Sequence, residues 1–335
     1  MRERRYSLGL SILLLLILSN NVLSSTGTPF RTANYSPLVQ IFGLPPMADV
    51  DAFRRNRTEI SLSSDIINQF SLTENARELA VMDGDTYRTT FSYSAKPIQN
   101  FQWQLAIPYV QYRGGTIDGF VDEWHKIFGL PEGGRNMRPK DRQWYFYKRN
   151  DKVLLDLREP QAGVGDVLLT GQWKMKQPFR QRGGVQALTA SVKIPTGDEQ
   201  ALLGSGGVDV SVGYAANTPE KVKAYDFSWY TSMGIVWLGR SYYLADQQTS
   251  LVLFGGVGAS FPVFANLDIK AQFDANSSFY SDTNIAQIGQ EALQFTFGGE
   301  WAINKSWRLD FGLSEDFIVD ASPDVVFHLA LYAGF

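Results

Sequence analysis

The residues best suited to chemistry are few and lie far apart in the chain. The only acidic cluster beside a histidine comprises Asp118, Asp122, Glu123 and His125. A hydrolytic or metal centre would need these groups on one face of an element, with a further ligand close by. His125 lies off the helical face that Asp118 and Asp122 share, and no second histidine is near. We therefore expect a solvent-facing helix here and assign no metal ligand and no catalytic residue.

The second histidine, His328, lies between Phe327 and Leu329, so it shares the polar side of an alternating segment. A lipid-hydrolysing enzyme would place a histidine beside a nucleophilic serine and an orienting polar group. No such serine can be assigned from spacing. We predict a hydrogen-bonding histidine in the wall of the fold, and an enzyme acting on lipid or lipopolysaccharide through His125 or His328 stays an alternative.

Composition excludes several classes of function. The 335 residues include no cysteine, which excludes disulfides, thiolate nucleophiles and cysteine-ligated metal centres. The net charge is -3, and no basic stretch follows the first five residues, so no nucleic-acid partner is expected. A mean hydropathy of -0.16 is too polar for a bundle of membrane helices. No cofactor is expected.

The N-terminus carries the features of an export signal. Three arginines among the first five residues precede an apolar core over 8–18 and a small, polar exit. Residues 1–25 are therefore predicted to be a cleaved signal peptide. Residues 26–55 are apolar and proline-rich without the length of a strand, so we expect them either in the periplasm or folded into the rest of the protein as a plug.

From residue 56 to residue 335 apolar side chains recur at every second position. About twelve segments show this period of two, most of them near the 9–11 residues that a tilted strand needs to cross a bilayer. In the first segment Ile60 and Leu62 alternate with Glu59 and Ser61. In a barrel the polar members face the lumen; the candidates are Arg57, Glu59, Arg88, Asp268, Lys270, Glu300, Arg308, Asp310 and His328.

Alternation alone does not separate a soluble sandwich from a membrane barrel, but three further features do. Short connections interleave with longer ones, such as 71–84 and 113–162; aromatic residues gather at strand ends; and the chain ends on an alternating strand with Phe335. We predict an all-β, transmembrane antiparallel β-barrel of about twelve strands in the outer membrane, with short periplasmic turns and longer extracellular loops. Its expected partners are membrane lipid, the barrel assembly machinery through Phe335, and a small-molecule solute.

Several segments resemble one family of bacterial outer-membrane proteins, DUF3187. They are Ile41 to Pro45, Met82 to Arg88, Gly114 to His125, Gly163 to Asp166, Lys193 to Asp198 and Glu315 to Asp324. The Pro-Thr-Gly-Asp turn is also similar to barrel families thought to pass phenolic or other apolar compounds. The resemblance implies an outer-membrane channel or uptake protein for small solutes, apolar ones included. It supplies no catalytic residue, and a surface-structural barrel is the remaining alternative.

Overall fold

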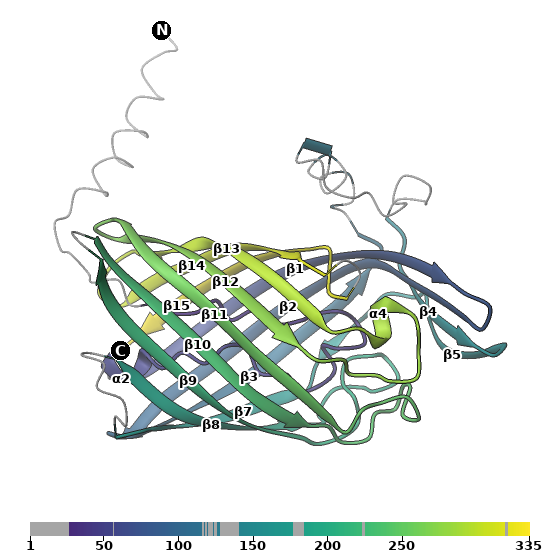
Figure 1. Ribbon diagram of the computed structural model, residues 1–335, viewed down its shortest axis with the longest axis horizontal. Coiled ribbons are helices and arrows are strands. Elements are labelled where there is room, and N and C mark those ends of the chain that lie inside the picture. Colours follow the sequence, from purple (N-terminus) through teal and green to yellow (C-terminus); the bar gives the residue numbers. More distant parts are fainter. Residues whose placement is uncertain are drawn as a thin grey trace, which may run out of the picture.

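Twelve antiparallel strands close into a barrel in the computed structural model (Figure 1). The structure describes residues 27–55, 57–115, 117, 119, 123, 126–127, 141–176, 184–222, 225–318 and 321–335. The strands of the barrel are β1 (Glu59–Glu74), β2 (Glu78–Ile98), β3 (Phe101–Arg113), β7 (Val167–Lys174), β8 (Val185–Ile194), β9 (Asp209–Val222), β10 (Tyr225–Trp237), β11 (Leu251–Phe264), β12 (Leu267–Asn276), β13 (Ala292–Ala302), β14 (Trp307–Asp316) and β15 (Val325–Gly334). The last strand pairs with the first, with Gly334 opposite Glu59, so the barrel is closed. The predicted fold class is confirmed.

The outer face of the barrel is apolar. Leu62, Leu253 and Phe297 expose 54%, 56% and 52% of their surface, whereas the neighbouring Ser61 and Thr296 are buried. Large apolar side chains exposed around a whole barrel are stable in hydrocarbon and not in water. The alternation read from the sequence therefore has its apolar members toward lipid, and the protein is of the outer-membrane type.

Part of the sheet continues beyond the barrel. Strands β4 (Trp144–Arg149) and β5 (Lys152–Leu157) extend the sheet from the far end of β2, and β6 (Gln161–Val164) pairs with the end of β3. The sequence analysis was wrong to treat 71–84 and 113–162 as long loops. The first nine residues of β2 are almost all buried, so both faces are covered and the period of two disappears from the sequence.

Helix is scarce in the described part of the chain. Two four-residue helices are named, α2 (Ala52–Arg55) and α4 (Ala286–Gly289). No helix among the described residues is long and apolar enough to cross a membrane. The predicted signal peptide lies outside the described residues.

Residues 27–55, here called the plug, run through the barrel as a hairpin. At the end of the barrel that holds the short turns, the carbonyl of Gly27 accepts a hydrogen bond from Asn217 (2.8 Å). At the opposite end, the carbonyl of Leu38 accepts one from the hydroxyl of Tyr280 (2.9 Å). The chain then returns to α2, which lies at the same end of the barrel as the C-terminus (Figure 1). Both ends of the plug thus meet the periplasmic rim, and its tip reaches the extracellular loops.

A hydrophobic cluster surrounds the tip of the plug. It joins the tip to the ends of the strands and to the extracellular loops; its members include Leu38, Ile41, Phe42, Met82, Tyr112, Tyr145, Leu202, Leu244, Phe279, Tyr280 and Ile288. Phe42 stacks on Phe279 with ring centroids 5.3 Å apart. The extracellular mouth is therefore filled by packed apolar side chains.

Candidate functional site in the barrel lumen

The inward faces of the strands form two unlike walls. On β12 to β15 the inward residues include five ionisable ones; the wall that these strands form is here called the charged wall, and these residues are Lys270, Glu300, Arg308, Asp310 and His328. Around the middle of β1, β2, β7, β8 and β9 many inward residues are short and carry hydroxyl groups; this set, the hydroxyl wall, comprises Ser61, Ser63, Thr90, Ser92, Thr170, Thr189, Ser191 and Ser211. The plug lies between the two walls.

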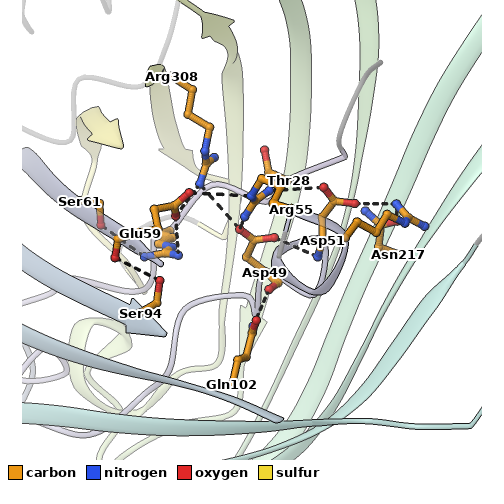
Figure 2. Close-up of polar contacts among 12 residues, drawn as sticks. Thr28, Asp49, Asp51, Arg55, Glu59, Ser61, Ser94, Gln102, Asn217 and Arg308 are labelled. Atoms are coloured by element: carbon orange, nitrogen blue, oxygen red, sulfur yellow. Dashed lines mark hydrogen bonds and ion pairs between the residues drawn. The ribbon is translucent and has the colours of Figure 1, made fainter. Parts of the chain in front are cut away.

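At the periplasmic end, Arg308 connects the barrel to the plug. Its Nη1 and Nη2 atoms donate to Glu300 (2.9 Å) and Glu59 (3.0 Å), which lie on β13 and β1. Its Nη2 also lies 3.8 Å from Asp49 of the plug, and Asp49 in turn pairs with Arg55 of α2 (Figure 2). Buried charges are stable only when paired, so removal of one member leaves its neighbours uncompensated. This periplasmic network fixes the base of the plug.

Deeper in the lumen, Phe30 anchors the ascending arm of the plug. The Nζ atom of Lys270 lies 2.9 Å from Asp310 and 4.2 Å from the centre of the Phe30 ring. The side chain of Gln272 accepts a hydrogen bond from the backbone N–H of Phe30 (2.8 Å) and donates one to its carbonyl (3.2 Å). The charged wall therefore holds both the ring and the backbone of this residue.

His328 is buried in the wall beside Phe30. The register of β1 and β15 places it opposite Asp65, and its Nδ1 lies 2.6 Å from a carboxylate oxygen of that residue. Its Nε2 has no hydrogen-bond partner in the described part of the chain. The structure thus supplies an orienting carboxylate but no serine hydroxyl on the other nitrogen, as hydrolysis would require.

The two aspartates of the plug near α2 experience different surroundings. Burial acts to raise the pKa of Asp49, but Arg55 and Arg308 hold it below its ordinary value. Burial dominates at Asp51 and raises its pKa to about 6, although Arg55 opposes the shift. Asp51 pairs with Arg54 (2.6 Å) in the first turn of α2. The base of the plug therefore includes one carboxylate whose charge is costly at neutral pH.

The tip of the plug is held by a second buried cluster. The Nζ atom of Lys193 lies 2.6 Å from Asp166 and 3.2 Å from Asp209, and it donates to the carbonyl of Ile41 (3.0 Å). Asp209 also accepts the backbone N–H of Gly43 (2.7 Å). The sequence indicates the turn after Lys193 but gives no signal for its contact with Ile41, 152 residues away.

A cavity of about 110 Å³ remains between the plug and the hydroxyl wall. The register sets Ser63 beside Thr90 and Thr170 beside Ser191, so small side chains lie next to one another across the strands. Ser61 accepts a hydrogen bond from Arg31 of the plug (3.5 Å), and the short reach of the other hydroxyl side chains leaves the cavity beside them. The plug side of the cavity is largely apolar and includes Phe42, Leu44, Pro45 and Met47.

The remaining predicted site residues are scattered. Arg88 lines the cavity, and Asp268 accepts a hydrogen bond from Ser260 (3.2 Å). Arg57 was predicted to face the lumen, but it precedes β1 and donates to the carbonyl of Lys305 at the rim. The side chain of Glu123 is exposed, and its three companions, Asp118, Asp122 and His125, lie outside the described residues. Among the described residues no cluster of three groups could hold a metal ion.

Comparisons with known proteins agree on the fold. The model of the family described as "Protein of unknown function (DUF3187)" matches residues 7–335. The chain is similar to the COG4313 outer membrane channel from Pseudomonas putida F1, with 12% identity and a TM-score of 0.55 over 84% of this chain and 96% of that one. The Ralstonia pickettii toluene transporter TbuX is 10% identical, with a TM-score of 0.39 over 90% and 98% of the two chains. No curated protein sequence matches.

Proposed function

The chain belongs to the DUF3187 family of proteins of unknown function, and from that premise we propose that it passes small solutes across the outer membrane along the hydroxyl wall. The observation that carries this proposal is the cavity of about 110 Å³ beside the plug. A ladder of serine and threonine hydroxyls can exchange hydrogen bonds with water or with a passing solute. On the charged wall, by contrast, Lys270 and Arg308 reach the plug.

The described arrangement is the closed state of this path. Apolar packing around Phe42 fills the extracellular mouth, and the network around Arg308 fills the periplasmic end. Passage therefore requires the plug to shift. The plug contributes Phe42, Leu44 and Met47 to the cavity, and this surface suits solutes with an apolar part, such as those named for the toluene transporter with a similar barrel.

A cavity-filling variant tests the path. Thr170→Trp places a large ring in the cavity, and Leu169→Trp, one residue away on the lipid-facing side of β7, is the matched control. We expect solute flux into proteoliposomes, measured with the full chain, to fall several-fold in the first variant and to stay unchanged in the second.

A second variant tests the proposal if the unmodified barrel is too tightly closed to pass solute. Phe30→Ala removes the anchor beside Lys270, and we expect flux above that of the unmodified chain because the ascending arm is loosened. If neither the unmodified chain nor Phe30→Ala passes any small solute, the proposal is wrong.

Export and assembly follow from the two ends of the chain. We propose that residues 1–25 direct export, and that the barrel assembly machinery contacts Phe335, whose side chain is 70% exposed at the end of β15. Deletion of Phe335 is expected to lower the yield of barrel in outer-membrane fractions, while a Phe335→Tyr control keeps an aromatic terminus. Equal yields would contradict the role of this residue.

A further inference from the structure

The cavity contains one cation that has no carboxylate of its own. Five charged residues line it: Arg31, Asp49, Arg88, Asp166 and Lys193. Four of them belong to the ion pairs at the base and the tip of the plug, with Arg31 3.8 Å from Glu59. Asp65 lies opposite Arg88 in the register of β1 and β2, but its carboxylate pairs with His328, and no carboxylate in the described part of the chain lies within ion-pair distance of Arg88. The lining therefore carries an excess positive charge at this side chain.

Neutral groups hold the guanidinium in place. Its Nη1 donates to the side-chain oxygen of Gln40 on the plug (3.4 Å), and its Cζ lies 5.1 Å from the centre of the Tyr35 ring. These contacts orient Arg88 without neutralising it. Because Gln40 uses its oxygen on Arg88, only its amide N–H groups remain for another partner.

Two buried donors beside the cavity lack acceptors. Neither Nε of Arg88 nor Nε2 of Gln40 has a hydrogen-bond partner within the described residues. Buried polar atoms left without partners are rare and costly, and a guanidinium matches the geometry of a carboxylate. An anionic oxygen placed here would satisfy both donors and balance the charge.

The rest of the cavity lining indicates which kind of molecule carries the anionic group. Phe42, Leu44 and Met47 give the plug side an apolar surface, and the volume of about 110 Å³ approaches the roughly 150 Å³ that accommodates a benzene ring in a protein. We propose that Arg88 and Gln40 bind the carboxylate of a small organic acid whose apolar body packs against the plug. This inference rests on the proposed function and narrows its solute class to single-ring or short-chain monocarboxylates.

Calorimetric titration of the full chain in detergent tests the site with benzoate, with its neutral counterpart benzamide, and with chloride. We expect benzoate to bind at least tenfold more tightly than benzamide, and chloride to compete only weakly. Arg88→Gln is expected to weaken benzoate binding at least tenfold and to leave benzamide binding unchanged. The control is Arg158→Gln, which changes an arginine that is 60% exposed and distant from the cavity lining.

Gln40→Glu provides an independent variant that does not remove the cation. The new carboxylate lies beside Arg88 and competes with any ligand, so we expect benzoate binding to be lost while the melting temperature is maintained or raised. Retained binding in this variant or in Arg88→Gln overturns the inference, as does equal affinity for benzoate and benzamide. Competition by chloride at equal concentration assigns an inorganic-anion site and overturns the organic-acid class.

The binding experiment is separable from the flux experiment because detergent-solubilised protein has no transport to measure. Arg88-dependent binding of benzoate in a barrel that passes no solute would overturn the proposed function alone. Flux that Thr170→Trp blocks, in a barrel that binds no benzoate, would overturn the inference alone.

Discussion

The charged wall and the hydroxyl wall are built on the same antiparallel ladder with the same alternation, yet the charged wall packs against Phe30 of the plug and the hydroxyl wall borders a cavity. On the charged wall, Lys270 reaches Asp310 and Phe30 together. On the hydroxyl wall, Thr170 and Ser191 are adjacent and leave a cavity in front of them. The pleat decides which residues face inward, but the length of each side chain decides whether the lumen there is filled or hollow.

Removal of the buried lysine should reveal the largest difference between the walls. Lys270→Met leaves Asp310 buried without its cation and removes one of the two cations beside Glu300, and we expect a loss of roughly 3–5 kcal/mol in the free energy of unfolding. Thr189→Val on the hydroxyl wall is the matched control and should change it by less than about 1 kcal/mol. Urea unfolding in detergent measures both. Similar values for the two variants would mean that the walls do not differ in how they stabilise the barrel.

A change of pH should alter the free energy of unfolding through Asp51, at the periplasmic end of the plug. We expect this effect to be smaller than that of Lys270→Met. The pKa of Asp51 is raised to about 6 in the folded protein, so the folded state binds this proton more tightly than the unfolded chain does. The stabilisation is present at low pH and is lost as the pH rises through about 6. Between pH 5 and pH 8 we expect the free energy of unfolding of the unmodified protein to fall by about 1 kcal/mol more than that of the Asp51→Asn variant. Identical pH profiles of unfolding for the two proteins would show that Asp51 is not buried as described.

The smallest expected difference between the walls comes from the same serine-to-alanine substitution made on each of them. Ser314 bonds Thr296 (2.7 Å) outside the cavity lining, whereas Ser191 bonds Ser211 at the edge of the cavity. Ser314→Ala leaves the Thr296 hydroxyl buried without a partner, while in Ser191→Ala a water molecule can replace the lost group. We expect the first change to cost roughly 0.5 kcal/mol more in unfolding experiments. A larger cost for Ser191→Ala than for Ser314→Ala would contradict a cavity beside the hydroxyl wall.

The sequence predicts the barrel well because its main signal is local. Each lipid-facing side chain, such as Leu62 or Phe297, is separated by one residue from the next, and twelve such segments need no knowledge of their partners. The extensions of β1 and β2 were missed because residues on both faces of the first part of β2 are buried, which removes the alternation. The predicted polar faces include Glu59 and Arg308 but do not indicate their pairing, since these residues are 249 positions apart.

The lack of an ion pair at Arg88 could not be predicted from the sequence for the same reason. The alternation places Arg88 inward, but only the structure shows that it contacts Gln40 and Tyr35 of the plug, while Asp65, opposite it in the register, pairs with His328. Charge balance inside a lumen depends on contacts between distant segments. A single sequence indicates which charges enter the lumen and not which of them find partners.

The plug enters and leaves the barrel through one rim. Its start at Gly27 bonds Asn217, and α2 leads directly into β1 at the same end. Because both ends of the hairpin stay at that rim, neither has to be threaded through the lumen, so the cylinder can be completed first and the hairpin inserted afterwards. It can also be drawn back toward the periplasm without unzipping any strand, so the tether at β1 keeps it available to be reinserted.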